Sequence, residues 1–478
     1  MSVHQNFIAG EWRASSRTSP NINPSNTDES IGEYALADES DTETAIAAAT
    51  EAFSGWSTSG IQQRFDALDG IATEILARKE ELGRLLAREE GKTLPEGIGE
   101  VARAGQIFKF FAGETLRLTG DVVPSVRPGI NVEITREPVG VVGIVTPWNF
   151  PIAIPAWKIA PALAYGNCVV FKPASLVPGS AWALADIIGR SGLPAGVFNL
   201  VLGPGSVVGN ALLEDRRIAA VSFTGSVETG HRVATACSAR GAKFQLEMGG
   251  KNPLVVFNDA DLDIAVDCAV NGAFYSTGQR CTASSRLIVE AGIHDRFVDA
   301  MIEATGSLRV GDAMDESTQI GPVVDQAQLN QDVDYIGIGK SEGATLAVGG
   351  DPVEGKTPGF YLSPALFVDT DNAMRINREE IFGPVATVIR AQDQDEAVAI
   401  ANDTEFGLSA GVCTRSMAAA NRFKQGSRAG MVMVNLPTAG VDYHVPFGGT
   451  KASSYGAREQ GSYAAEFYTT VKTAYIRP

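Results

Sequence analysis

The chain has 478 residues, of which 44% are hydrophobic, and its formal net charge at pH 7 is −17. This length predicts two or three globular domains, and the negative charge argues against nucleic acid and anionic membranes as partners, because both attract basic surfaces. The sequence shows neither an apolar run of about 18 residues nor a basic segment followed by an apolar one, so we expect no membrane span, no signal peptide and a cytoplasmic location.

The cysteines also point to a reducing compartment. They are odd in number and include no CxxC pair, which argues against a disulfide framework and against a metal site. The five are Cys168, Cys237, Cys268, Cys281 and Cys413.

The first part of the chain is expected to be mainly helical. Residues 1–40 predict short strands and turns, and 120–136 predicts a β-hairpin. Between them, apolar residues recur at helical spacing. These helices are expected within 42–53, 61–90 and 98–116.

From Gly140 onward, short apolar strands alternate with helical segments, which predicts the α/β fold class with parallel sheets. The first run has strands at 141–145, 168–171, 197–201, 218–223 and 243–246, with helices expected at 152–165, 179–190, 206–213 and 226–238. A second α/β run covers 252–430, and an edge strand is expected within 459–478. Ligands bind at the carboxyl ends of parallel strands, so polar residues there are candidates for a site.

Several strands are followed by such residues. The amide of Asn149 either holds a developing oxyanion or satisfies a turn beside proline. Lys172 either binds ribose hydroxyls or is a surface lysine. Gly225 allows close approach to a phosphate before a helix, although the segment is not a G-x-G-x-x-G motif.

Two further residues suit a reaction at a carbonyl carbon. Cys281 stands among small polar residues just before an apolar strand, and it is either a nucleophile or a buried structural cysteine. Glu247 is followed closely by glycines, and it is either a general base or a surface residue in a turn.

Seven short segments, in one order, carry a resemblance to the aldehyde dehydrogenase superfamily over essentially the whole chain. They are PWNFP (147–151), KPA (172–174), FTGS (223–226), EMGGKNP (247–253), GQRC (278–281), EEIFGP (379–384) and PFGG (446–449).

The resemblance implies an aldehyde dehydrogenase-like fold of three parts. A Rossmann-like NAD(P)-binding domain would cover 1–117 and 139–249, and an α/β catalytic domain would cover 250–449. A small β oligomerisation element would combine 118–138 with 459–478, giving a homodimer or homotetramer.

The resemblance also implies a mechanism. Cys281 would attack the aldehyde to form a thiohemiacetal, and Asn149 with the Cys281 amide would stabilise its oxyanion. Oxidation would give a thioester, which Glu247 would hydrolyse by activating water. The presence of Glu247 favours hydrolysis over transfer to coenzyme A.

Cofactor contacts are implied for Thr146, Trp148, Lys172, Ser175, Gly225, Ser226, Glu380 and Phe382. At the position of Ser175, NAD-preferring members often carry a glutamate that repels the 2′-phosphate. With a neutral Ser175, we expect that NADP is accepted as well as, or in preference to, NAD.

The expected substrate is a small aldehyde that carries a carboxylate. The segments 278–286, 435–449 and 458–461 are similar to the α-ketoglutaric semialdehyde (2,5-dioxopentanoate) dehydrogenases. Succinic semialdehyde remains an alternative substrate, because the segment Lys172-Pro-Ala-Ser175 also resembles one found in succinic semialdehyde dehydrogenases.

Arg280 and Arg286 are candidates for binding the carboxylate, although either guanidinium has a possible structural role instead. The other pocket candidates are Phe150, Trp157, Phe274, Tyr275, Tyr443 and His444, each of which could instead be a packing residue. A non-catalytic protein that keeps the fold is the competing class, and the presence of Cys281, Glu247 and Asn149 speaks against it.

Overall fold

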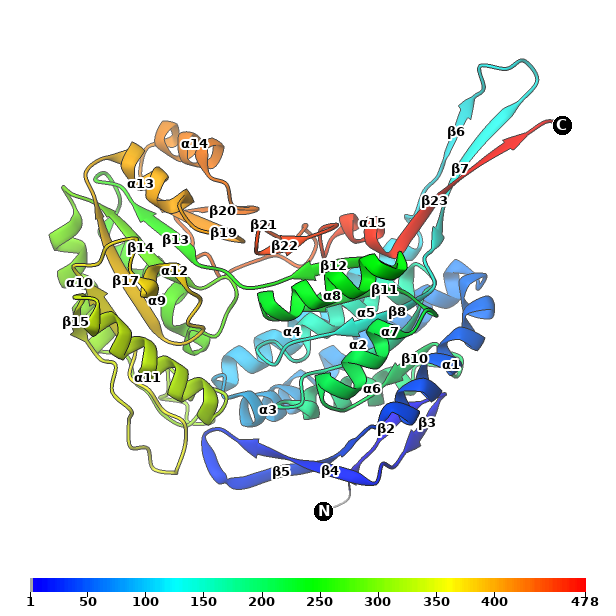
Figure 1. Ribbon diagram of the computed structural model, residues 1–478, viewed down its shortest axis with the longest axis horizontal. Helices are drawn as coiled ribbons and strands as arrows, with labels where there is room; N and C mark the ends of the chain where they lie inside the picture. The colour runs from blue at the N-terminus through cyan, green and yellow to red at the C-terminus, as the bar shows by residue number, and fades with distance from the viewer. Residues whose placement is uncertain (1–2) are drawn as a thin grey trace.

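The computed structural model describes residues 3–478, and it shows two α/β lobes side by side, each built on one large sheet, with a β arm projecting from one of them (Figure 1). Met1 and Ser2 lie outside the described residues. They are the first two positions of the predicted 1–117 domain and of the N-terminal segment for which no signal peptide is expected. Among residues 3–478, no helix is both long and apolar enough to span a bilayer.

The N-terminal strands connect the two α/β lobes. A hairpin of β4 and β5 extends beneath the molecule in Figure 1 toward the second lobe. At its turn the Thr27 amide donates to the Pro358 carbonyl at 2.6 Å, and the Tyr361 hydroxyl donates to the Ser25 carbonyl at 2.7 Å. The strands are β1 (Val3–His4), β2 (Asn6–Ile8), β3 (Glu11–Arg13), β4 (Arg17–Asn23) and β5 (Asn26–Leu36).

Four helices follow, and their ends follow from local chemistry. Asp38 and Thr93 each complete a capping box at a helix start. The periodic segment 61–90 contains two helices rather than one, because the chain leaves helical geometry at Arg78. The helices are α1 (Glu39–Ser57), α2 (Ile61–Ala77), α3 (Lys79–Glu90) and α4 (Leu94–Thr115).

The first large sheet has the order β22-β12-β11-β8-β9-β10-β2-β3, in which β8 to β12 are parallel to one another. The chain proceeds from β8 to β10 in one direction and then returns to place β11 on the other side of β8. This topological switch point marks the expected ligand crevice at the carboxyl ends of β8 and β11. The strands are β8 (Val141–Val145), β9 (Cys168–Lys172), β10 (Phe198–Leu200), β11 (Ile218–Thr224), β12 (Lys243–Glu247) and β22 (Ser454–Tyr455).

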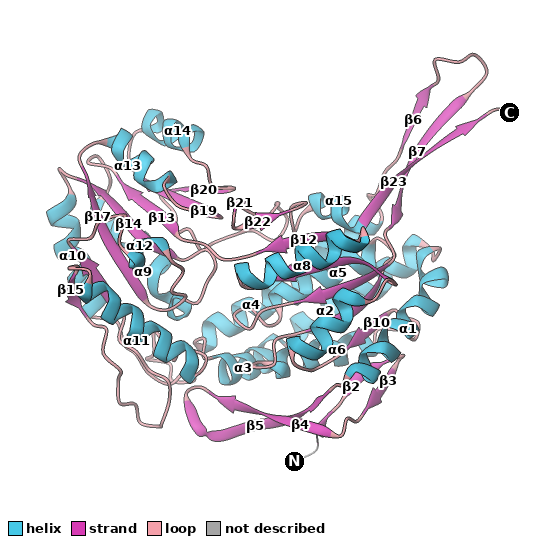
Figure 2. Cartoon of the chain, viewed as in Figure 1, coloured by secondary structure: helices cyan, strands magenta, loops and turns pink. Residues whose placement is uncertain are grey.

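Helices cover both faces of this sheet, as Figure 2 shows, and its central strands β8, β9 and β10 are almost wholly buried. A π-helical turn at Gly205–Gly209 precedes α7, within the helix expected at 206–213. The helices after β8 are α5 (Ala153–Ala164), α6 (Pro178–Gly189), α7 (Asn210–Glu214) and α8 (Val227–Arg240).

The second large sheet has the order β15-β16-β17-β14-β13-β19-β20, and its six strands from β16 to β20 are parallel. Its strands are β13 (Asn252–Val256), β14 (Ser284–Glu290), β15 (Thr345–Val348), β16 (Ala365–Val368), β17 (Val385–Ala391), β19 (Ser409–Cys413) and β20 (Met431–Val434). A separate pair is formed by β18 (Phe406–Gly407) and β21 (Thr450–Lys451). The helices are α9 (Leu262–Phe274), α10 (His294–Gly306), α11 (Gln326–Ser341), α12 (Arg375–Arg378), α13 (Gln394–Asn402) and α14 (Met417–Gly426).

The arm combines the hairpin with the end of the chain. β6 (Asp121–Pro124) pairs with β7 (Asn131–Pro138), and β23 (Thr469–Ile476) follows α15 (Ala465–Tyr468) and pairs along the other edge of β7. The C-terminus lies beside the hairpin in Figure 1. The expected edge strand in the tail is therefore present.

The α/β fold class with parallel sheets is confirmed. The functional division into 1–117 with 139–249, 250–449, and 118–138 with 459–478 stays a prediction. One segment that this division leaves out, around β22, belongs to the first sheet, because Glu247 pairs with Ser454 and Leu246 with Tyr455.

Candidate active site

The loop that carries Cys281 is held in an unusual backbone conformation. Ser276 and Thr277 have φ of 51° and 57°, and Gly278 has φ of 67°. Non-glycine residues rarely adopt this left-handed region, and such strain concentrates at functional sites. At Gly278 a side chain would also collide with the Gly383 carbonyl, because a Cβ atom there would lie 2.2 Å from that oxygen.

Glu96, in the first turn of α4, fixes this loop. One carboxylate oxygen accepts from the Ser276 amide at 2.8 Å, from the Ser276 hydroxyl at 3.0 Å and from the Arg280 guanidinium at 3.1 Å. The other oxygen accepts from the amide and hydroxyl of Thr93. The sequence does signal this capping box, but not its link to the loop.

Within residues 3–478, Cys281 is the one cysteine with partial solvent access, since Cys168, Cys237, Cys268 and Cys413 are buried. It precedes β14 at the amino end of the second sheet. Asn252 holds its backbone, donating to the Cys281 carbonyl at 2.8 Å.

Asn149 lies in the segment between β8 and α5, and its side chain points to the nucleophile loop. Its Nδ2 donates to the carbonyl of Gln279 at 2.9 Å. An amide nitrogen carries two hydrogens, so this bond leaves the second one for another acceptor.

Glu247 ends β12 and is 3% exposed. Its Oε2 accepts from the hydroxyl of Ser454 at 2.6 Å, and its Oε1 lies close to Gly448, where a Cβ would approach it to 2.8 Å. Burial, and then the nearby carboxylate of Glu459, raise the pKa of Glu247 well above its usual value.

The charges around Cys281 oppose its ionisation. Burial raises the pKa of the thiol to about 12, and the carboxylates of Glu380 and Glu247 add to this shift, while backbone amides of Cys281 and Thr282 oppose it. The same two carboxylates therefore lie within electrostatic reach of the sulfur. In this arrangement the thiol is protonated at neutral pH until a base removes its proton.

The switch point of the first sheet offers unpaired polar groups. The hydroxyls of Thr146 and Thr224, at the carboxyl ends of β8 and β11, are buried without a hydrogen-bond partner. Lys172 is 6% exposed, bonds only to the Pro173 carbonyl at 2.8 Å, and has its pKa lowered to about 8 by burial. Ser175 is exposed and donates to the Gly203 carbonyl at 3.2 Å.

The remaining candidates for cofactor contact surround the same crevice. Ser226 caps the 14-residue helix α8, and Gly225 packs against the ring of Phe223. Glu380 accepts from the Gly250 amide at 2.9 Å, and burial raises its pKa to about 7. The rings of Trp148 and Phe382 meet edge to face with centroids 5.4 Å apart.

These residues fit a dinucleotide. Orphaned hydroxyls, a buried lysine and a helix N-terminus lie at one switch point, and each is a group that ribose or pyrophosphate satisfies. The sequence pointed to Thr146, while Thr224 was not singled out.

Arg280 and Arg286 both have partners within the protein. Arg280 bonds to Glu96 and also to the Ser276 hydroxyl at 2.9 Å. Arg286 is 0% exposed and donates to carbonyl oxygens of Lys251, Ile400 and Ala401. A role of Arg280 in substrate binding stays a prediction, and Arg286 has the structural role that was its alternative.

The aromatic candidates differ in burial. Phe274 is 0% exposed and belongs to the hydrophobic core that packs against the second large sheet. Phe150 and Tyr275 are half-buried, and His444 is exposed, with its ring 5.5 Å from that of Tyr443. Trp157 is 7% exposed, its ring packs at a tilt against that of Phe447 with centroids 5.4 Å apart, and its indole N–H is unpaired.

A buried charge cluster lies directly behind Asn149, and sequence reasoning missed it. Lys92 is 2% exposed, and its ammonium donates to the Asn149 carbonyl and to Glu100 Oε2. The other oxygen of Glu100 accepts from the amides of Ile152 and Ala153 at 3.1 Å. Glu100 therefore anchors the start of α5 as well as Lys92.

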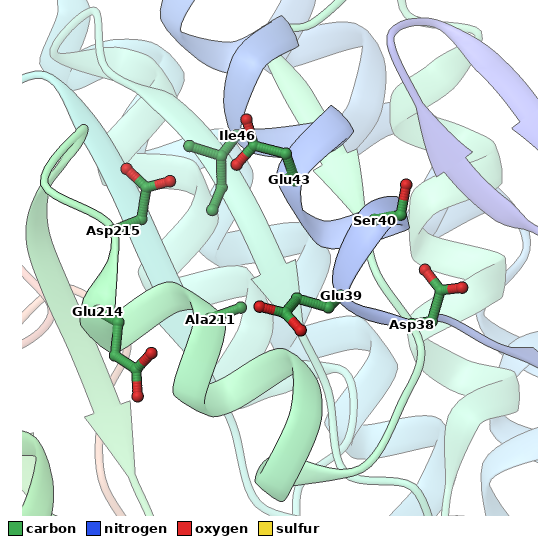
Figure 3. A pocket seen from close by; sticks show the side chains of 8 residues that line it. All are labelled: Asp38, Glu39, Ser40, Glu43, Ile46, Ala211, Glu214 and Asp215. Atoms are coloured by element: carbon green, nitrogen blue, oxygen red, sulfur yellow. The ribbon is translucent and has the colours of Figure 1, made fainter.

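A cavity of about 690 Å³ lies elsewhere, between α1 and α7. Figure 3 shows that carboxylates from both helices surround it. None of its lining residues belongs to the seven sequence segments, and its negative charge would repel a dinucleotide pyrophosphate. It is lined by Asp38, Glu39, Ser40, Glu43, Ile46, Ala211, Glu214 and Asp215.

Comparison with known proteins gives consistent matches over nearly the whole chain. The profile described as the aldehyde dehydrogenase family matches residues 12–474. Alpha-ketoglutaric semialdehyde dehydrogenase of Bacillus subtilis is 44% identical over 100% of this chain and 99% of its own length. Alpha-ketoglutarate semialdehyde dehydrogenase of Haloferax volcanii is 43% identical over 98% of each chain.

Solved structures agree. Betaine aldehyde dehydrogenase of Staphylococcus aureus, crystallised with NAD+, superposes with a TM-score of 0.97 at 35% identity, covering 99% of this chain and 94% of that one.

Proposed function

The chain belongs to the aldehyde dehydrogenase family, and on that premise we propose that it oxidises a carboxylate-bearing aldehyde, α-ketoglutaric semialdehyde, to the corresponding acid. Family membership makes it an NAD(P)-dependent aldehyde dehydrogenase. The observation that carries the proposed chemistry is the environment of the partly accessible Cys281 thiol: the Asn149 side chain bonds to the backbone two residues before it, and the buried carboxylate of Glu247 acts on it electrostatically.

The proposed reaction begins when the sulfur of Cys281 attacks the aldehyde carbon and forms a thiohemiacetal. Because its thiol has a raised pKa, attack requires transfer of the thiol proton to a base, and Glu247, itself with a raised pKa, is suited to accept it. The free N–H of Asn149 and the backbone N–H of Cys281 stabilise the oxyanion.

Thr146, Thr224, Lys172, Ser226, Glu380 and the Trp148–Phe382 pair would hold NAD or NADP. A bound nicotinamide ring supplies the hydride acceptor for the oxidation. The protein's own contribution at this stage is to hold the oxyanion and to exclude water from the sulfur.

Hydrolysis of the resulting thioester requires an activated water. Glu247 first releases to solvent the proton that it took from Cys281. Its carboxylate, held by the Ser454 hydroxyl, then removes a proton from that water as it attacks the acyl carbon. Cys281 leaves as the thiolate and the acid is released. A carboxylate in this position favours hydrolysis over transfer to coenzyme A.

Both NAD and NADP are proposed cofactors. Ser175 is neutral and exposed beside the buried Lys172, which leaves room for a 2′-phosphate. A cytoplasmic location is also proposed, in keeping with five free thiols.

We further propose a homodimer or homotetramer that assembles through the arm of β6, β7 and β23. Apolar side chains are exposed on this arm, and such patches mark contact surfaces. They include Val122, Val126, Val471, Tyr475 and Ile476.

Steady-state formation of reduced cofactor tests the function, with NAD and NADP in parallel. The aldehydes are α-ketoglutaric semialdehyde, succinic semialdehyde and the uncharged pentanal. We expect the highest kcat/KM for the first and no activity in Cys281→Ala. Equal kcat/KM for pentanal would disprove the proposed substrate class, and activity in Cys281→Ala would disprove the mechanism.

A further inference from the structure

Three buried N–H donors without acceptors lie in the same region of the structure. They are Nε of Arg103 on α4, Nε1 of Trp157 on α5 and Nε2 of Gln460 before α15. Buried polar groups in proteins are nearly always paired, so neighbouring unpaired donors indicate an absent acceptor. Gln460 is 0% exposed and Trp157 is 7% exposed, so bulk water does not satisfy them.

Contacts connect the three residues that carry these donors. Nη2 of Arg103 donates to Oε1 of Gln460 at 3.4 Å. Phe447 connects Trp157 with Gln460. Its ring packs against that of Trp157 at a tilt of 31°, with centroids 5.4 Å apart, and its amide donates to the carbonyl of Glu459, next to Gln460, at 2.7 Å.

The α4 and α5 helices run alongside each other in the same direction. Glu100 on α4 binds the amides at the start of α5, and farther along the ring of Phe111 lies 6.4 Å from that of Tyr165. Arg103, one turn after Glu100, therefore lies beside the first turns of α5, where Trp157 is found.

The same contacts lead to the catalytic residues from both sides. On one side, Glu100 holds the segment that follows Asn149, and Arg103 stands one helical turn after Glu100 on α4. Gly448, next to Phe447, approaches Glu247 on the base side. The donor cluster is thus beside the proposed site of reaction.

Gln460 has a strained backbone, with φ of 60°, which is unusual for a residue that is not glycine. Such strain is retained where the surrounding structure and function require it. The residue with this strained backbone is the one whose side-chain amide contacts the Arg103 guanidinium.

Charge also distinguishes Arg103 from the other candidate arginines. Asp442 and Glu100 act on it electrostatically, but neither forms an ion pair with it within 4.0 Å, and no other ion pair of residues 3–478 includes it. Arg280, in contrast, is paired with Glu96 at 3.1 Å. Arg103 is thus a partly buried cation with no anionic partner.

We propose that Arg103, Gln460 and Trp157 bind the carboxylate of the aldehyde substrate. This inference rests on the proposed function and names the residues that select its substrate class. A carboxylate accepts several hydrogen bonds at once, and a guanidinium matches its planar geometry.

The test compares kcat/KM for α-ketoglutaric semialdehyde and for pentanal in the wild type, Arg103→Met, Arg103→Lys and Gln460→Met. We expect Arg103→Met to lower kcat/KM for the semialdehyde by roughly 30-fold or more relative to its effect on pentanal, because a buried charge pair loses one member. Arg103→Lys should recover part of this loss. Gln460→Met should show a smaller loss with the same selectivity.

A second readout measures binding without chemistry on the charged substrate. The product, α-ketoglutarate, should inhibit pentanal oxidation, and Arg103→Met should raise its inhibition constant in parallel with the loss in kcat/KM. Thermal unfolding of each variant checks that the variant is folded. Arg280→Met is the matched control, and we expect its loss to be equal for both aldehydes because it loosens the nucleophile loop.

The outcomes separate the two proposals. A wild type that does not prefer the semialdehyde disproves the proposed substrate, and this inference with it. A wild type that does prefer it, combined with equal losses for both aldehydes in Arg103→Met or no loss, overturns the inference and leaves the proposed function standing. A selective loss in Arg280→Met alone would assign the carboxylate to Arg280 instead.

Discussion

The ammonium group of Lys92 donates a hydrogen bond to the backbone carbonyl of Asn149, the residue proposed to hold the oxyanion. The same ammonium contacts Glu100 at 2.8 Å and lies 3.7 Å from the centre of the Phe150 ring. A buried cation thus fixes the backbone whose side chain must be aligned with Gln279 and the nucleophile.

Replacing Lys92 with Met should destabilise the protein and slow the reaction. The carboxylate of Glu100 loses its buried cation, which costs about 3–5 kcal/mol in unfolding free energy. The Asn149 amide loses its alignment, so kcat should fall more than KM rises. Denaturant unfolding and steady-state kinetics measure the two effects.

Lys109→Met is the control for this substitution. Lys109 is also on α4, but its side chain is 55% exposed and pairs with Asp69 at the surface. Its loss should change the unfolding free energy by less than about 1 kcal/mol. Similar effects in both variants would show that the buried contact has no special role.

The reactivity of Cys281 should increase with pH. Its pKa is raised to about 12, so the thiolate fraction rises up to tenfold per pH unit through the neutral and alkaline range. Glu380→Gln removes one of the negative charges that raise this pKa, so the curve should move to lower pH. The rate of iodoacetamide modification of Cys281, followed by mass spectrometry without cofactor, measures the curve.

Glu379→Gln is a neighbouring control, because Glu379 bonds instead to Tyr335 at 2.7 Å and Arg375 at 3.0 Å. Its curve should match that of the wild type. An equal shift in both variants, or a shift of the Glu380→Gln curve to higher pH, contradicts the electrostatic explanation.

Ser175→Glu should change the cofactor preference. A carboxylate beside Lys172 would repel the 2′-phosphate, and like charges at such a contact cost several kcal/mol. We expect kcat/KM for NADP to fall by roughly 100-fold relative to that for NAD. Ser175→Gln, which has similar size without charge, should have a much smaller effect, and an equal loss in both variants would indicate steric exclusion.

Charges placed on the arm should disrupt the assembly. Val471 and Tyr475 are 60% and 62% exposed on β23, so the double change to Asp alters the contact surface without opening a core. Light scattering after size exclusion should give a mass near the 50.3 kDa of one chain instead of a multiple of it. Met417→Asp, at a residue 74% exposed on α14, should leave the assembly intact. A wild type of single-chain mass would contradict the proposed oligomer.

Much of the fold was predictable because local periodicity and buried strands determine it. The strands from 141 to 247 appear close to their predicted bounds, since each is a short apolar run between helices. The break at Arg78 was not predictable from periodicity, because the apolar spacing continues through it.

Contacts between distant segments could not be read from the sequence. Arg280 stands next to Cys281, which suggested a role toward the substrate, yet its partner Glu96 is 184 positions away. Arg103 gave no signal, because a lone arginine in a helix is ordinary. Its lack of a carboxylate partner is visible only in the structure, where the Arg103 guanidinium contacts the side-chain amide of Gln460.

The last residues of the chain complete interactions that begin in its middle. Ser454 contacts Glu247, Glu459 pairs with the fully buried Lys158, and β23 pairs with β7. Without residues 454–476, Lys158 would be a buried cation with no counterion, and Glu247 would lack its hydroxyl donor. The proposed base therefore depends on a segment that is more than 200 positions away from it in the chain.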